Sequence, residues 1–228
     1  MGKIRPLKES SHGLGHVTSS IRKAEPSPWV PFEDRRRARD EKREAVLRMA
    51  VRMFLDDGYH RTSLSDVAAR LNITKPALYN YFRSKDDILA ECYARGFALY
   101  EQGLAAGLRD EDGGIARLRA LIRAYALVIA TDFGRCVVRL DDRELPAHAR
   151  EDVRVTKRRI EQAFRDAIAL GMRDGSIAPC DSALTSFAIT GALNGIGAWF
   201  DPAGTRSAEE VADSFAVQLT AGLAGDRP

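Results

Sequence analysis

The segment from Thr62 to Lys85 constrains the fold more than any other part of the chain, because it contains two helix starts joined by a very short turn. Ser63 and Asp66 have the spacing of a capping box, and apolar residues then recur at helical spacing as far as Leu71. Asn72 tolerates the left-handed backbone conformation that stops one helix and turns sharply into another. The first half of the segment therefore predicts a short helix followed by a tight turn.

The second half of this segment predicts a helix that separates its residues by face. Thr74 is a suitable N-cap, and Pro76 falls in the first turn, where its missing N–H costs nothing. Leu78 and Phe82 are four residues apart and can pack inward. The opposite side presents a cationic and phenolic surface made of Lys75, Ala77, Tyr79 and Tyr81. Two helices in this arrangement predict a helix-turn-helix.

The outward surface of the second helix suits DNA. With Thr62 and Ser63 before it and Lys85 after it, the surface offers groups for the phosphate backbone and the major groove. Each of these residues alone is compatible with ordinary packing or a solvated surface, but the joint pattern favours DNA binding. The charge distribution agrees: residues 1–85 hold 18 Lys and Arg against 10 Asp and Glu, whereas residues 86–228 hold 17 against 22.

Helical periodicity extends over most of the chain, and no convincing strand pattern occurs. From Asp40 an apolar stripe runs to Leu55, and Gly58 is a natural left-handed stop for that helix. The preceding segment is rich in proline, serine and glycine and ends in an arginine run, which favours either contacts with DNA or a solvated surface. We predict an all-α protein with a flexible basic arm over residues 1–37, a helix-turn-helix DNA-binding domain over 38–85, and a larger helical domain over 86–228.

The run from Phe54 to Leu89 resembles the DNA-binding signature of the TetR family of bacterial transcriptional regulators. The shared features include Gly-Tyr at a helix end, a Thr-Ser entry, Val-Ala-Ala, Leu-Tyr-x-Tyr-Phe, and Ser-Lys-Asp-Asp at the next helix start. Asn72 stands where glycine is more usual, a difference that the turn should tolerate. The resemblance implies phosphate contacts by Thr62, Ser63 and Lys85, and a recognition surface made of Lys75, Ala77, Tyr79, Asn80 and Tyr81.

The larger domain is expected to bind an effector and to dimerise. We predict helices over about residues 85–108, 115–131, 149–174, 184–200 and 208–223, with the second of these in the centre; residues 132–145 are ambiguous, and a short helix with loops is expected there. Three glycines in one helix, Gly191, Gly195 and Gly197, indicate either a closely approaching helix or ligand, or a crowded core. In a TetR-like protein the last two helices would pair with their copies in a homodimer.

A DNA-binding domain joined to such a domain suggests a repressor of double-stranded operator DNA that a small molecule controls. The candidate effector-binding residues are Tyr125, Phe133, Phe187, Asn194 and Trp199, although aromatic residues at this spacing are more often core. The segment from Trp199 to Gly204, with Ser207, Glu209 and Glu210, is similar to TetR-like regulators of fatty-acid and sterol catabolism that respond to acyl-CoA thioesters. Coenzyme A phosphates could contact Arg154, Lys157, Arg158 and Arg159, or these could form a solvated helix face.

Several other classes of function are not supported by the sequence. No catalytic motif, nucleotide-binding loop or metal-ligand spacing occurs, so we expect neither an enzyme nor a cofactor or metal. The lack of a long apolar run or secretory signal predicts a cytoplasmic protein without membrane segments. Cys92, Cys136 and Cys180 are expected to be buried thiols, with a DNA-binding redox sensor as the alternative. A regulator that needs a corepressor is a further alternative.

Overall fold

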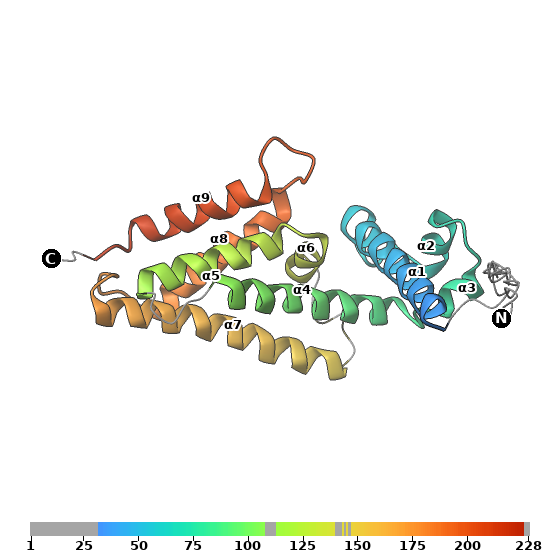
Figure 1. Cartoon of the computed structure of the whole chain (residues 1–228), viewed down its shortest axis with the longest axis horizontal. Coiled ribbons are helices and arrows are strands. Elements are labelled where there is room, and N and C mark those ends of the chain that lie inside the picture. The colour runs from blue at the N-terminus through green and yellow to red at the C-terminus, as the bar shows by residue number, and fades with distance from the viewer. Residues whose placement is uncertain (1–31, 108–112, 140–142, 144, 146, 226–228) are drawn as a thin grey trace, which may run out of the picture. The chain divides into compact units, whose positions relative to one another are not determined.

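The computed structural model describes residues 32–107, 113–139, 143, 145 and 147–225. The regular secondary-structure elements in these ranges are all helices (Figure 1). The predicted all-α fold is confirmed. In the described part, β-structure is limited to a single bridge between Ile177 and Ala224. The elements are α1 (Phe32–Met53), η1 (Phe54–Gly58), α2 (Leu64–Arg70), α3 (Lys75–Tyr79), α4 (Lys85–Gly107), α5 (Gly114–Ile129), α6 (Asp132–Arg139), α7 (Ala147–Asp174), α8 (Ser182–Trp199) and α9 (Ala208–Ala221).

The first helix begins earlier than the sequence suggested. By its backbone contacts the chain forms two compact units, residues 1–38 and residues 39–228. The described part of the first unit, from Phe32, is already helical. The arginine run that we assigned to a flexible arm therefore belongs to α1. Arginine is a good helix former, and Glu33 and Asp34 in the first turn suit the positive end of a helix dipole. The predicted arm as far as residue 31 lies outside the described residues.

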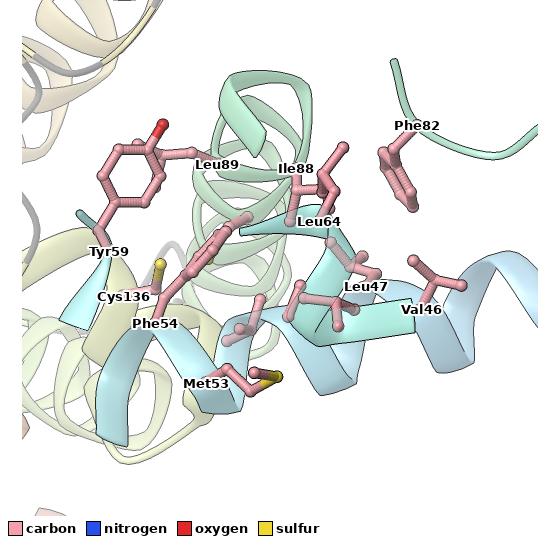
Figure 2. Packing of buried hydrophobic residues seen from close by; sticks show 14 of the residues in the cluster. Val46, Leu47, Met53, Phe54, Tyr59, Leu64, Phe82, Ile88, Leu89 and Cys136 are labelled. Atoms are coloured by element: carbon pink, nitrogen blue, oxygen red, sulfur yellow. The ribbon is translucent and has the colours of Figure 1, made fainter. Parts of the chain in front are cut away.

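Within the second unit, the buried side chains form two clusters. The first, which we call the N-terminal core, joins the helix-turn-helix to parts of α4, α6 and α7 (Figure 2). Its members are Val46, Leu47, Ala50, Val51, Met53, Phe54, Leu55, Tyr59, Leu64, Val67, Ala68, Leu78, Phe82, Ile88, Leu89, Cys92, Tyr93, Cys136, Leu145 and Val153. The first turns of α4 are thus packed with the DNA-binding helices, and the border between the two cores does not fall at residue 86.

The second cluster, the C-terminal core, surrounds α5, which packs against α4, α7, α8 and α9. Its members are Tyr100, Leu118, Leu121, Ile122, Ala126, Val128, Ile129, Ala130, Ile160, Phe164, Ala167, Ile168, Ile177, Ile189, Leu193, Ile196, Phe200, Val211, Ala212 and Ala216. The expected central position of the helix over residues 115–131 is confirmed. No helix in the described ranges is both long and apolar enough to cross a membrane.

Close backbone approaches hold α6 in place. A Cβ atom at Gly96 of α4 would lie 2.7 Å from Val137 Cγ2, and one at Gly197 of α8 would lie 2.5 Å from Val138 Cγ2. A Cβ atom at Gly134 itself would lie 1.9 Å from the Val128 carbonyl oxygen, so only glycine fits there. Because α6 also contacts η1, this short helix connects the C-terminal helices with the DNA-binding end of the second unit.

The local stop and start signals were predicted correctly. Asn72 has a φ of 54° and Gly58 a φ of 93°, so both adopt the expected left-handed conformation. Capping boxes form at the starts of α2 and α9. These signals act through neighbouring residues, which is why the sequence alone is sufficient to recognise them.

Candidate functional site

The helix-turn-helix is held by side-chain caps at both of its helix starts. The Ser63 hydroxyl accepts a hydrogen bond from the Asp66 backbone N–H at 3.2 Å, and the Asp66 carboxylate accepts one from the Ser63 N–H at 2.9 Å. Hydrogen bonds from the Ser63 side chain and backbone lower the pKa of Asp66. At the second start, Thr74 Oγ1 accepts from the Ala77 N–H at 3.4 Å. These caps fix the turn that presents α3.

The two faces of α3 are separated as the spacing predicted. Leu78 and Phe82, the second just beyond the helix, are buried in the N-terminal core. Lys75 and Asn80 are exposed, and Tyr79 is 43% exposed. The Lys75 ammonium lies 5.9 Å from the centroid of the Tyr79 ring. A cation and a phenol side by side on an exposed helix are suited to a phosphate and a base edge.

The other two members of the predicted recognition surface are less accessible. Helix α3 ends at Tyr79, with Asn80 as its C-cap, so Tyr81 lies beyond the helix. Its side chain is partly buried and packs against the N-terminal core. Ala77 is partly buried as well. The exposed part of the surface is therefore centred on Lys75, Tyr79 and Asn80.

Thr62 is placed differently from the expectation. Its side chain is 3% exposed, and its hydroxyl lies within hydrogen-bond distance of two carbonyl oxygens, Gly58 O at 2.9 Å and Met53 O at 3.3 Å. A hydroxyl has one proton to donate, and here it caps the end of η1. We therefore assign the Thr62 side chain a structural role and leave the phosphate contact to the exposed Ser63.

Lys85 also has a structural contact. Its ammonium donates to the Tyr59 carbonyl oxygen at 3.2 Å and lies 4.3 Å from the centroid of the Tyr59 ring. The Tyr59 hydroxyl in turn donates to the carboxylate of Asp86. This network ties the residues after η1 to the first turn of α4. Since Lys85 remains partly exposed, a phosphate contact by its ammonium stays a prediction.

A cavity of about 410 Å³ lies between α4, α5, α6, α7 and α8. We call it the central cavity. Its wall combines apolar side chains with polar groups, and it contains Gly96, where α4 approaches Val137 of α6, and Gly134, where α6 approaches Val128 of α5. The lining residues are Gly96, Phe97, Tyr100, Tyr125, Val128, Ile129, Gly134, Val137, Val138, Lys157, Ile160, Glu161, Phe187, Thr190 and Asn194. A hollow that combines apolar side chains with a few placed polar groups is typical of small-molecule sites.

Three of the five predicted effector residues line this cavity. Tyr125 donates to Asn194 Oδ1 at 2.8 Å, and burial raises the pKa of Tyr125 to about 12. Phe187 lies on the same wall as Asn194. Phe133 instead packs against the N-terminal core, and Trp199 stacks on Phe215 with ring centroids 6.2 Å apart. Neither of these two residues is among those that line the cavity.

Sequence reasoning missed several lining residues. On α4, Tyr100 follows Phe97 by three residues, so helical spacing could have identified it. Its hydroxyl is buried and has no hydrogen-bond partner among the described residues, and burial raises the pKa of Tyr100. Lys157 was considered only as a contact for phosphate. Glu161 and Thr190 carried no recognisable signal, because their role depends on the packing of α7 and α8.

The four cations predicted on α7 differ in their surroundings. Arg158 pairs with Glu151 at 2.9 Å, and Arg154 lies 3.8 Å from the same carboxylate. Arg159 pairs with Glu101 at 3.1 Å. Lys157 lines the central cavity, with its ammonium 6.0 Å from the centroid of the Tyr93 ring. Among these four, Lys157 is best placed to meet an anionic group of a bound molecule.

Two of the three cysteines are buried as expected and offer little chemistry, whereas Cys180 is partly exposed. Cys92 and Cys136 are fully buried in the N-terminal core, and burial raises the pKa of the Cys92 thiol well above its ordinary value. Such a thiol is a poor nucleophile, since the thiolate is the reactive form. Within the described ranges, no three His, Cys, Asp or Glu residues lie close enough to hold a metal ion.

Comparison with known proteins matches both parts of the chain. A sequence profile of the tetR family of bacterial regulatory proteins matches residues 46–92, and one of the tetracycline repressor-like C-terminal domain matches residues 111–223. The transcriptional repressor KstR2 of Mycolicibacterium smegmatis is 26% identical over 186 residues, which are 80% of this chain and 90% of that protein. The transcriptional activator FasR of the same species is 33% identical over 87 residues, which are 38% of this chain and only 40% of FasR.

Solved structures show the same arrangement of helices. The structure of AibR in complex with isovaleryl coenzyme A and operator DNA superposes with a TM-score of 0.67 and 25% identity, over 77% of this chain and 96% of that chain. KstR2 of Mycobacterium tuberculosis superposes with a TM-score of 0.75 at 19% identity, over 81% of this chain and 96% of that chain.

Proposed function

Because the chain belongs to the TetR family of bacterial transcriptional regulators, we propose that it represses transcription from a palindromic operator as a homodimer and leaves the DNA when a small molecule enters the central cavity. As a member of this family it is a DNA-binding regulator and not an enzyme. In the proposed dimer the two α3 helices enter grooves about 34 Å apart, one turn of the double helix. An effector that prefers a dimer with another spacing weakens operator binding by its difference in affinity for the two states.

The observation that supports effector control is the position of the central cavity. Its wall includes Gly96 and Phe97 of α4 and Gly134 and Val137 of α6. Phe97 and Val137 also pack against the N-terminal core. A molecule that fills the cavity contacts α4 and α6, the two helices that also pack against the DNA-binding end. Binding in the cavity and the position of α3 are then linked through direct contacts.

We further propose an acyl-CoA or another lipid metabolite as the effector. AibR, whose structure contains isovaleryl coenzyme A, supports this class, as do the apolar side chains in the cavity wall. The acyl group would lie among the apolar side chains, and the anionic remainder would lie beside Lys157. Thermal-shift measurements with isovaleryl coenzyme A and other acyl-CoA esters test this, with free coenzyme A as the control. If no acyl ester raises the melting temperature more than free coenzyme A, acyl-CoA effectors are excluded.

A corepressor-dependent regulator and a redox sensor, the two alternative functions, predict different effects on operator binding. A corepressor would strengthen operator binding, the opposite sign of the same linkage. The redox sensor receives little support, because Cys92 and Cys136 are buried and the pKa of Cys92 is raised. Operator binding measured with and without hydrogen peroxide decides this point. A response to peroxide that disappears when the cysteines are replaced would revive the redox alternative.

Tyr79→Ala tests the DNA-binding surface. Tyr79 is 43% exposed on α3, so its removal should leave the fold intact while weakening specific binding by about 1–3 kcal/mol, or about 5- to 150-fold. Fluorescence anisotropy with DNA from upstream of the gene measures the affinity. Val155→Ala, an equally exposed position on α7, is the matched control. Unchanged, salt-sensitive specific binding by Tyr79→Ala would show that α3 is not the reading element.

A further inference from the structure

The wall of the central cavity contains one hydroxyl group that the described chain does not use. Tyr100 of α4 lines the cavity and is only 4% exposed. Its hydroxyl is closed to solvent and has no hydrogen-bond partner among the described residues. A buried hydroxyl without a partner is costly, and most buried polar side chains in native proteins have one. The arrangement around Tyr100 therefore lacks a hydrogen-bond partner.

The polar groups nearby in the cavity wall are already paired with other residues. The Tyr125 ring lies edge-on to that of Tyr100, with the centroids 5.7 Å apart, but its hydroxyl donates to Asn194 Oδ1 at 2.8 Å. Glu161, the carboxylate among the lining residues, pairs with Arg165 one turn further along α7. Neither group serves Tyr100, so its partner has to come from a bound molecule.

The Tyr100 hydroxyl is suited to a neutral acceptor. Burial raises the pKa of Tyr100, and it raises that of Tyr125 to about 12, so both hydroxyls keep their protons at neutral pH. Lys157 is the cation among the lining residues, and its ammonium lies 6.0 Å from the ring of Tyr93, two helical turns before Tyr100 on α4. An anionic group belongs beside that lysine, because a buried charge without a counter-ion is unfavourable.

We infer that Tyr100 donates a hydrogen bond to a neutral carbonyl oxygen of the effector. The inference rests on the proposed function, because it requires an effector in the central cavity. A carbonyl accepts a hydrogen bond and brings no donor that would itself need a partner, unlike an alcohol. The apolar Phe97, Val128 and Ile129 in the wall would surround the groups on either side of it. A ketone, an ester or a thioester meets these requirements, whereas a hydrocarbon leaves Tyr100 without a partner.

The hydrogen bond would also link recognition of the carbonyl to the shape of the cavity. Because the Tyr100 hydroxyl is closed to solvent, an acceptor reaches it only when the wall beside it moves. Formation of the bond then favours the moved arrangement of the wall, which includes α4. An apolar molecule of similar size would fill the cavity without this gain. Tyr100 would thus distinguish effectors from other apolar molecules.

The ligand-free protein gives the first test. Tyr100→Phe removes a hydroxyl without a partner, so its melting temperature should equal or exceed that of the wild type. Tyr125→Phe, the matched variant, removes a hydroxyl that donates to Asn194 and should melt about 2–4 °C lower. A similar decrease for Tyr100→Phe would show that its hydroxyl already has a partner, and the inference would be overturned.

Two matched pairs of compounds test recognition of the carbonyl. Isovaleryl coenzyme A is compared with the thioether in which a methylene group replaces its carbonyl group. Methyl heptyl ketone is compared with the alkene in which a methylene group replaces its carbonyl oxygen. By isothermal titration calorimetry, the wild type should bind the carbonyl compound of at least one pair about fivefold more tightly than its counterpart. Tyr100→Phe should bind both members of that pair equally.

The outcomes separate this inference from the proposed function. A preference in the ketone pair alone, lost in Tyr100→Phe, would support the inference and remove acyl-CoA from the proposed function. A preference that survives in Tyr100→Phe would overturn the inference and leave the proposed function intact. Equal binding within both pairs, or no binding of any of these compounds, would overturn the inference as well.

Discussion

The two hydrophobic cores of the second unit are built differently. The N-terminal core contains fully buried large side chains such as Phe54, Leu78 and Leu89, and charged pairs between α1 and α4 lie at its surface. The C-terminal core has equally well-buried residues, among them Leu121 and Phe164, but it borders a cavity of about 410 Å³. The central cavity is lined by fully packed members of the C-terminal core, such as Ile129 and Ile160, whereas the N-terminal core reaches it only through the partly buried Phe97 and Val137.

This difference indicates that the two cores have different mechanical roles. Close-packed interiors resist deformation, so the DNA-binding helices and the first turns of α4 are expected to move together as one body. A cavity lets the surrounding helices adopt more than one arrangement, and a ligand selects among them. The helices α4 and α6 take part in both regions. They are therefore the elements through which one region acts on the other.

A matched pair of leucines gives the largest expected effect. Leu89 in the N-terminal core and Leu121 in the C-terminal core are both essentially inaccessible. Leu89→Ala and Leu121→Ala should each lower the free energy of unfolding by about 2–5 kcal/mol, because each leaves a cavity. Hydrogen exchange separates their effects. Leu89→Ala should speed exchange mainly in α1, α2 and the first half of α4, and Leu121→Ala mainly in α5 and α9. Identical exchange patterns would mean that the two cores open as one unit.

The sequence predicted the local features of the DNA-binding end better than the effector site. The Ser63–Asp66 capping box and the left-handed Asn72 depend on neighbouring residues, and both are present. The positions of the Phe133 and Trp199 side chains depend on how α6 and α8 pack against other helices. Helical periodicity in the sequence does not contain that information. The burial of the Thr62 side chain was missed for a related reason: its hydroxyl donates to the Gly58 carbonyl at the end of η1, and nothing in the sequence indicates that a π-helix ends there.

The glycines of α8 show the same limit. Of the two alternatives, the crowded core is observed at Gly197, which lies against Val138, whereas a Cβ atom at Gly191 or Gly195 would meet no atom of the described residues within 4 Å. The spacing of the α8 glycines is visible in the sequence, but the atoms that each glycine faces are not. Only the packed helices distinguish a contact within the chain from a surface open to another molecule.

A smaller effect is expected from the charged pairs that join α1 to α4. Glu91 accepts hydrogen bonds from Arg43 at 3.2 Å and from Arg95 at 3.0 Å, and the Arg43 bonds lower the pKa of Glu91. A lowered carboxyl pKa stabilises the fold above the ordinary value of 4.5, and this stabilisation is lost as the pH falls through the pKa of the folded state. Glu91→Gln should therefore cost about 1 kcal/mol at pH 7 and progressively less below pH 4.5.

Urea unfolding at several pH values measures this loss. Asp152→Asn, an exposed carboxyl on α7, is the control and should change stability little at any pH. A cost for Glu91→Gln that is the same at pH 7 and at pH 3.5 would show that packing, and not charge, joins α1 to α4. The N-terminal core would then owe its rigidity to apolar contacts alone.

The central claim, that α4 and α6 transmit the state of the cavity to the DNA-binding end, is tested most directly by two glycine substitutions in α4. Gly96→Ala would bring a methyl group to 2.7 Å from Val137 Cγ2, and because the β-branched Val137 has few rotamers, α6 must shift. Gly103→Ala would meet Ala124 Cβ at 3.4 Å, an ordinary contact. Operator affinity measured for both variants is the decisive quantity. We predict binding about fivefold weaker for Gly96→Ala, or about 1 kcal/mol, and no change for Gly103→Ala. Wild-type affinity for a folded Gly96→Ala protein would contradict the account.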